Sequence, residues 1–237
     1  MSLADANNQQ QYVNTCWSLF NTWGTLSPPE RMNRLLEAVN TIFRSIQIPA
    51  FTASMGRGLG GSNAQLDFQT WSIQMDPGVM GNRNIDSQTL GDLAITMYHE
   101  SRHGEQWYRV AQAVVAGICV PGGMGAVHAR YGVTAQQIAA ALFIPVRIAL
   151  DAEQKKRFFP NAMTAIVTGW FNSIYGTNAA HRNATLGNLQ GNYSAYRNLP
   201  EEVDAYATEQ KIRALWKMKM SSLGFDDALS GVAGLFG

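Results

Sequence analysis

Cysteine, histidine and charge are all scarce in this chain of 237 residues. It contains 2 cysteines, Cys16 and Cys119, and 4 histidines, and only 15% of its residues are Asp, Glu, Lys or Arg. Two isolated cysteines supply neither a disulfide framework nor a thiolate metal site. A charged fraction below the usual level of about 25% leaves the surface to be solvated largely by Asn, Gln, Ser, Thr and Gly.

Basic segments and long apolar runs are missing as well. The net charge is +1 and no block of Lys and Arg is present, so nucleic acid is not an expected partner. The two most apolar stretches, 110–127 and 133–150, are interrupted by Pro121-Gly122-Gly123 and by Pro145 and Arg147. Neither is a clean span of about 20 apolar residues, so we expect buried helices flanking a glycine loop in preference to a membrane-inserting segment.

Two of the four histidines lie in one short motif, His99-Glu100-Ser101-Arg102-His103. Histidines four residues apart project from the same face of a helix. Both can reach one tetrahedral zinc ion at about 2.0–2.1 Å. Glu100 points to an adjoining sector, where a carboxylate can take a proton from zinc-bound water. An HExxH motif arises by chance in about 1% of chains of this length. The alternative to a zinc site is a surface helix that carries a charged patch.

The flanks of the motif predict a long helix from residue 88 to about 117, with Asp86 or Ser87 as its N-cap. His99 and His103 share a polar stripe, whereas Gly104 falls on the apolar stripe, where a missing side chain permits close packing. Before this helix, residues 65–75 predict one strand whose alternation slips near Thr70, which indicates a bulge or bend. Such a strand could be an edge strand that pairs with an extended peptide.

A catalytic zinc site needs a third protein ligand from a separate element. The candidates are His128, His181 and an acidic cluster of Glu201, Glu202 and Asp204. The cluster opens a predicted helix from 201 to 222, where carboxylates are also favoured by the helix dipole without any metal. The residues by themselves leave this choice open.

A family resemblance bears on that choice. An HExxH motif followed much later by a glutamate-bearing helix resembles the gluzincin branch of zinc metallopeptidases. More closely, residues 98–107 (Tyr-His-Glu-Ser-Arg-His-Gly-Glu-Gln-Trp) resemble the YHEARHxEQW segment of metallopeptidase domains in bacterial toxin-like proteins, some of which accompany contractile injection systems. Residues 200–205 resemble the second motif of those domains, and the match implies Glu202 as the third ligand, with Glu201 as the fallback.

The sequence departs from the better-known gluzincin pattern at one position. That pattern has an aspartate four residues after the glutamate, and Tyr206 holds this place relative to Glu202. Asp204 or Asp92 would then be the carboxylate that supports a metal-bound histidine. His181 is a candidate to stabilise the oxyanion on a cleaved carbonyl, as are Tyr193 and Tyr196.

The fold we expect is α+β and helix-rich, a single zincin-like domain over 1–237 with a small β-sheet. Its parts are an N-terminal helical part (1–60), the edge strand with the HExxH helix (64–118), and a helical part carrying the third ligand (119–237). Further helices are predicted over 10–22, over 28–46 behind a capping box at Ser27 and Glu30, over 133–158 and over 161–175. We predict a linker or flap over 57–63, a loop over 177–193 and a terminal tail over 228–237.

The expected function is zinc-dependent hydrolysis of a peptide or protein substrate. Zinc would be held by His99, His103 and Glu202, with Glu100 as general base. The alternatives are a non-catalytic zincin-fold cargo or binding module and a zinc amidase acting on cell-wall links. Residues 1–10 show no signal peptide, so we expect synthesis in the bacterial cytoplasm and carriage by a contractile or other specialised secretion system.

Overall fold

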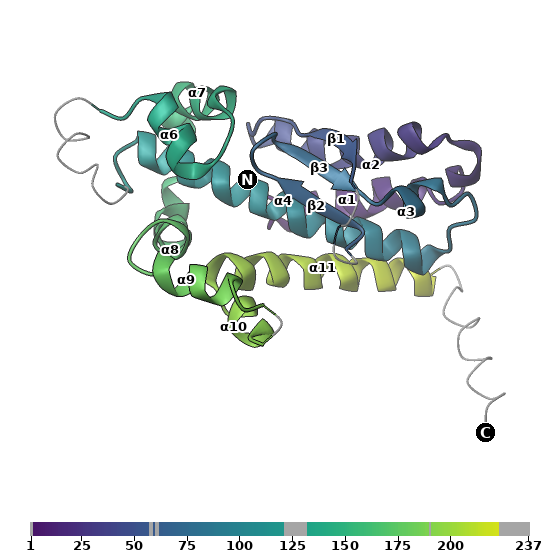
Figure 1. The fold of residues 1–237 in the computed structure, drawn as a ribbon. Coiled ribbons are helices and arrows are strands. Elements are labelled where there is room, and N and C mark those ends of the chain that lie inside the picture. The colour runs from purple at the N-terminus through teal and green to yellow at the C-terminus, as the bar shows by residue number, and fades with distance from the viewer. Residues whose placement is uncertain (1, 57–58, 60–61, 121–131, 190, 223–237) are drawn as a thin grey trace.

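Two long helices lie side by side in the protein (Figure 1). They are α4 (Ser87–Val115) and α11 (Pro200–Ser222) in a computed structural model that describes residues 2–56, 59, 62–120, 132–189 and 191–222. Trp216 of α11 donates from Nε1 to the carbonyl oxygen of Ser87 at 3.1 Å, and the Gln106 amide reaches the carbonyl of Glu201 at 2.8 Å. The end of α11 thus meets the start of α4, and the start of α11 meets the second half of α4, so the two helices are antiparallel.

Helix α4 is the core element that the HExxH flanks predict. The Asp86 carboxylate caps it by accepting from the Thr89 amide at 2.6 Å, which is the typical role of aspartate at an N-cap. Most of its side chains are buried, because helices or strands contact it along much of its length. The predicted range of 88–117 agrees with the observed helix to within two residues.

A small sheet lies against α4, next to the HExxH motif. Its strands are β1 (Thr52–Met55), β2 (Ala64–Asp67) and β3 (Ser72–Met75), in the order β1-β3-β2. Strand β1 is parallel to β3, and β2 is antiparallel to β3, with Leu66 opposite Ile73. The prediction of one bulged strand over 65–75 is wrong, because the slip near Thr70 is the turn of a hairpin. Trp71 ends that turn with a positive φ of 58°.

The N-terminal helices pack around α4 next to the sheet (Figure 1). They are α1 (Ala6–Ser18), α2 (Pro28–Ser45) and the short α3 (Pro77–Gly81). Helix α1 contacts α2, α4 and α11, and α2 contacts α4 and strand β1. The capping box at the start of α2 is confirmed, because the Ser27 amide donates to Glu30 Oε2 at 2.7 Å. The short 3-10 turn η1 (Trp23–Thr25) links α1 to α2.

The second half of the chain is more finely divided than the sequence predicts. It contains α6 (Ala135–Leu142), α7 (Val146–Gln154), α8 (Thr164–Ile174), α9 (Ala179–Leu186) and α10 (Tyr193–Arg197), with 3-10 turns η2 (Lys156–Phe158) and η3 (Asn161–Met163). The predicted helix over 133–158 is broken where Phe143 adopts φ 53° just before Pro145. The predicted loop over 177–193 is also wrong, since α9 occupies its first half. Asn and Gly residues flank this helix, but Ala179 and Ala180 begin it with strong helix formers.

The fold class is confirmed: the protein is a helix-rich α+β structure with a small mixed sheet of three strands. Within the described residues, every helix is too short or too polar to cross a bilayer. His128, most of the glycine-rich segment 57–63 and the tail 228–237 lie outside the described residues.

Close packing of the sheet side on α4 depends on Gly104, as the apolar stripe predicts. A Cβ added there would overlap the ring of Phe51. That ring has little room to move, because it packs on Phe43 and Trp71 at centroid distances of 4.9 and 5.1 Å. The Asn40 side chain also fixes the backbone of Phe51 through hydrogen bonds of 2.9 and 3.0 Å.

We predict that Gly104→Ala lowers the free energy of unfolding by about 1–3 kcal/mol, the usual cost of overpacking a core. The matched control is Gly169→Ala in α8, where an added Cβ meets no atom within 4 Å. That change should leave stability unaltered or raise it by up to about 1 kcal/mol through helix propensity. Urea unfolding of the three proteins measures both effects, and a Gly104→Ala protein as stable as the parent would contradict this packing.

Candidate metal centre

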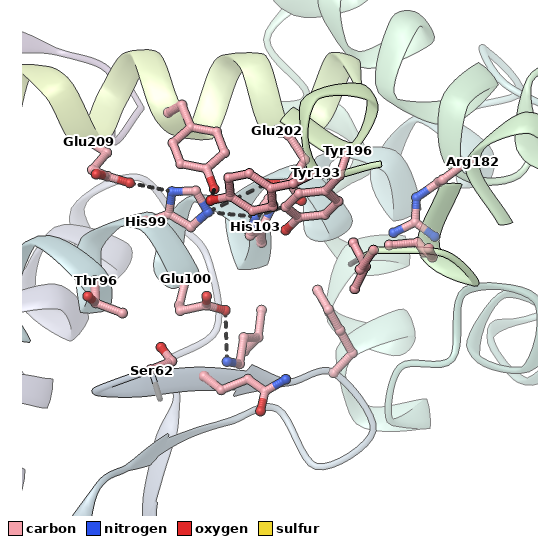
Figure 2. A pocket seen from close by; sticks show the side chains of 16 residues that line it. Ser62, Thr96, His99, Glu100, His103, Arg182, Tyr193, Tyr196, Glu202 and Glu209 are labelled. Atoms are coloured by element: carbon pink, nitrogen blue, oxygen red, sulfur yellow. Dashed lines mark hydrogen bonds and ion pairs between the residues drawn. The ribbon is translucent and has the colours of Figure 1, made fainter. Parts of the chain in front are cut away.

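A cavity of about 910 Å³ opens between α4, α11, strand β2 and the segment that carries α9 and α10 (Figure 2). The HExxH face of α4 and the first turns of α11 form one wall, and the edge strand β2 faces them. The side chains around it are Ser62, Gln65, Leu66, Phe68, Thr96, His99, Glu100, His103, Arg182, Leu186, Leu189, Tyr193, Tyr196, Glu202, Tyr206 and Glu209.

Three potential ligand atoms converge on this cavity. His99 Nε2 and His103 Nε2 are 3.1 Å apart. Glu202 places Oε2 at 3.6 Å from His99 Nε2 and Oε1 at 3.4 Å from His103 Nε2. All three side chains are buried. This is the group of three that could hold a metal ion within the described part of the chain.

The antiparallel helix pair produces this arrangement. One turn of α4 places both imidazoles on the face that meets α11. The first turn of α11 then directs Glu202 toward them, while the preceding residue, Glu201, points elsewhere and pairs with Arg182 Nε at 2.6 Å. Of the two glutamates that the sequence leaves as third ligands, the structure brings Glu202 to the histidines.

His103 is held by a chain of polar contacts on its far side. Its Nδ1 lies 2.8 Å from Gln106 Oε1, and Gln106 Nε2 donates to the Glu201 carbonyl and to Asp204 Oδ2, each at 2.8 Å. Because the amide nitrogen faces two acceptors, the amide oxygen must accept from His103, which places a proton on Nδ1. A neutral His103 therefore turns the lone pair of Nε2 toward His99 and Glu202.

His99 has a carboxylate behind it. Its Nδ1 forms an ion-pair contact with Glu209 Oε2 at 3.1 Å, and Glu209 also contacts Arg213 at 3.1 Å. The sequence predicted Asp204 or Asp92 for this role. In the structure, Asp204 contacts Gln106 and not a histidine, and Asp92 Oδ1 lies 3.3 Å from Arg213 Nη1. Glu209 was missed, although it lies seven residues after Glu202, two turns along the same face of α11.

Glu100 lies beside the three converging atoms and faces strand β2 (Figure 2). Its Oε2 accepts a hydrogen bond from the backbone amide of Leu66 at 2.9 Å. This bond fixes the direction of the carboxylate at the cavity wall. The edge strand that the sequence predicts next to the motif thus positions the candidate base.

The cluster favours bound protons when it holds no metal. Burial opposes protonation of His99, but the neighbouring Glu202 and Glu209 carboxylates outweigh it and raise the pKa of His99 to about 9. Burial likewise opposes a charged His103, yet Glu202 raises the pKa of His103 above its ordinary value. Burial would raise the pKa of Glu202, but the two histidines hold it far below its usual range. Even so, Glu202 Oε2 is a buried oxygen without a hydrogen-bond partner among the described residues.

The remaining predicted residues divide into two groups. Tyr193 and Tyr196 line the cavity, as does Tyr206, whose ring centroid is 4.8 Å from that of His99. His181 does not reach the cavity, because it is an exposed residue of α9 and its neighbour Arg182 takes the inward position. The sequence contained no signal for Arg182, since the predicted loop concealed the helix that orients it.

Comparisons with protein-family models, with curated proteins and with solved structures each found no match to this chain.

The pKa of His99 predicts how the metal-free protein responds to pH. A pKa raised from about 6.5 when unfolded to about 9 when folded stabilises the protein fully below pH 6.5, and this contribution disappears as the pH rises through 9. We expect unfolding in EDTA to require about 1–3 kcal/mol less at pH 9.5 than at pH 6.5.

Two histidine variants serve as the comparison in this pH experiment. His181→Gln removes an exposed histidine and should retain the full dependence, whereas His99→Gln should lose most of it. Urea unfolding across the pH range reports the result. A flat profile in the parent protein, or an equal slope in His99→Gln, would refute the assigned coupling.

Proposed function

We propose that this protein is a zinc-dependent peptidase. The observation that carries the proposal is the convergence of His99 Nε2, His103 Nε2 and a Glu202 carboxylate oxygen at one wall of an open cavity. Two histidines and a carboxylate are a ligand set of catalytic zinc sites, which keep a fourth position open for water or substrate.

The separations between the three atoms support zinc as the ion. Tetrahedral ligands at about 2.0–2.1 Å from zinc lie about 3.3–3.4 Å from one another. The observed separations of 3.1, 3.4 and 3.6 Å lie around that value. The pattern of supporting contacts also fits, because Gln106 and Glu209 stand behind the two imidazoles as partners that orient metal-bound histidines.

Hydrolysis of a peptide bond needs a group that moves a proton. Zinc, when bound, acts as a Lewis acid that makes water more acidic and polarises a carbonyl oxygen. Glu100 takes the proton as the water oxygen forms its bond to the carbonyl carbon. Glu100 then delivers that proton to the amine nitrogen as the C–N bond breaks. The hydrogen bond from Leu66 holds one oxygen of Glu100, so the other oxygen is the one assigned to proton transfer.

The resemblance of residues 98–107 to metallopeptidase domains of bacterial toxin-like proteins supports the same assignment. It also carries the proposal that the protein is an effector delivered by a contractile or other specialised secretion system. The rival functions are a non-catalytic cargo or binding module with this fold and an amidase that cleaves cell-wall links.

Measurements of zinc affinity can tell which of the two adjacent glutamates, Glu201 or Glu202, is a zinc ligand. We predict one zinc per chain, and we predict that Glu202→Gln weakens zinc binding by at least about 100-fold, because a ligand is lost. Glu201→Gln is the matched control, since Glu201 pairs with Arg182 instead. It should keep the parent zinc affinity. Competition with a chromogenic chelator measures both, and equal affinity in Glu202→Gln would remove Glu202 from the ligand set.

Activity tests the role of Glu100. Glu100→Gln keeps an oxygen that can accept from the Leu66 amide but loses the proton acceptor. We expect it to bind zinc normally and to lower kcat/KM for peptide hydrolysis by about 10²–10⁴-fold. Glu153→Gln in α7, away from the cavity, should retain parent activity. A fully active Glu100→Gln protein would rule out this mechanism.

Cleavage of a proteome-derived peptide mixture and of purified peptidoglycan tells the peptidase from the amidase. Stoichiometric zinc without turnover of either substrate would favour the binding module.

A further inference from the structure

Arg182 is the one Lys or Arg among the described residues that line the cavity. It projects from α9, one helical turn before Leu186, which lines the same wall. Figure 2 shows it across the cavity from Glu209, with the histidine cluster between them. The other described side chains that line the cavity are carboxylates, imidazoles, aromatic rings, leucines and the uncharged polar Ser62, Gln65 and Thr96.

Part of the role of Arg182 is structural. Arg182 Nε donates to Glu201 Oε1 at 2.6 Å, and Glu201 is fully buried. The guanidinium carbon also lies 5.7 Å from the centre of the Trp107 ring. These two contacts hold the guanidinium plane in place, which lowers the entropy lost when it binds a further group.

The pairing with Glu201 leaves most of the donors unused. A guanidinium carries five N–H groups, and only the one on Nε is directed to Glu201. Within the described residues, Nη1 and Nη2 have no hydrogen-bond partner. Two terminal nitrogens with a planar arrangement match the two oxygens of a carboxylate.

The distance to the proposed zinc site can be bounded. The His103 and Trp107 ring centroids are 6.3 Å apart, and Arg182 Cζ lies 5.7 Å from the same Trp107 ring. Arg182 Cζ is therefore no more than about 12 Å from the His103 ring. An extended peptide covers about 3.3–3.6 Å per residue, so three to four residues span the distance from Arg182 to the His103 ring of the proposed zinc site.

The surroundings of Arg182 favour an anion that arrives on an otherwise apolar segment. Phe68 stacks on Trp107 with a centroid distance of 4.3 Å, and Leu186 and Leu189 line the same cavity. Apolar walls exclude water and strengthen a charge-assisted hydrogen bond at their edge.

We propose that Arg182 binds a carboxylate of the peptide substrate within three to four residues of the cleaved bond. This carboxylate is either the free C-terminus or an acidic side chain. The inference rests on the proposed peptidase function, because it assigns specificity within that site. A role limited to neutralising Glu201 is the competing explanation.

The first experiment is cleavage of a randomised decapeptide library by the zinc-loaded protein, in two forms with a C-terminal carboxylate or a C-terminal amide. Mass spectrometry of the products locates each cleaved bond. We expect a free C-terminus, or Asp or Glu, to be enriched about 10- to 100-fold within four residues on one side of that bond. In Arg182→Gln this enrichment should vanish while cleavage of amidated, acid-free peptides continues.

Two further variants control for folding and for charge. Arg182→Gln leaves Glu201 buried without its partner, so the double variant Arg182→Gln with Glu201→Gln removes both charges and should show the same loss of selectivity. Arg34→Gln changes an exposed arginine of α2 away from the cavity, and it should cleave as the parent does. Equal enrichment in the parent and in the double variant would overturn the proposal.

The second experiment does not need turnover. Two pairs of peptide hydroxamates, one differing only in a terminal carboxylate or carboxamide and the other only in an Asp or Asn side chain, are titrated into the zinc-loaded protein. We expect the carboxylate form of at least one pair to bind about 10- to 100-fold more tightly, and the difference to disappear in the double variant. If the protein shows this difference but cleaves no peptide, the peptidase assignment fails and the anion subsite stands. If the two members of each pair bind equally, or no hydroxamate binds, the anion subsite is rejected.

Discussion

The antiparallel contact between α4 and α11 is the constraint on which the rest of the structure depends. Arg102 of α4, itself buried, binds Asp204 of α11 through Nε at 2.7 Å and Nη2 at 3.1 Å. Its third nitrogen binds Glu105, which also accepts from the Leu3 amide at 2.8 Å. Breaking one partner of such a buried pair typically costs about 3–5 kcal/mol. This network therefore fixes the register in which Glu202 meets the histidines, and it extends through Asp204 and Gln106 to His103 itself.

Local sequence signals predicted the elements that depend on local chemistry. The N-cap at Asp86 and the capping box at Ser27 each mark a helix start that the structure confirms. The predictions of secondary structure were wrong where tertiary contacts, or the backbone conformation of a single residue, determine where a helix or strand ends. The alternation over 65–75 continues across a turn, so a hairpin resembled one bulged strand. Strand β1 was missed because its four residues are largely exposed and show no alternating pattern.

The residues of the candidate site likewise differ in whether local sequence signals could predict them. His99, Glu100 and His103 follow from spacing on one helix, because helix geometry alone brings them together. Glu202 lies about one hundred residues later, and it was assigned from a motif resemblance and not from physical spacing. Glu209 and Arg182 could not be assigned, since their importance comes only from what the fold places opposite them. His181 was assigned to the site by its residue type alone, but its position on α9 leaves its side chain exposed.

The most direct test of the central claim is a crystal structure of the zinc-soaked protein with an anomalous difference map collected at the zinc absorption edge. The proposed centre predicts one strong peak per chain, about 2.0–2.2 Å from His99 Nε2, His103 Nε2 and a Glu202 oxygen. A map without a peak among these atoms, or a structure in which Glu202 turns away from the two imidazoles, would contradict it.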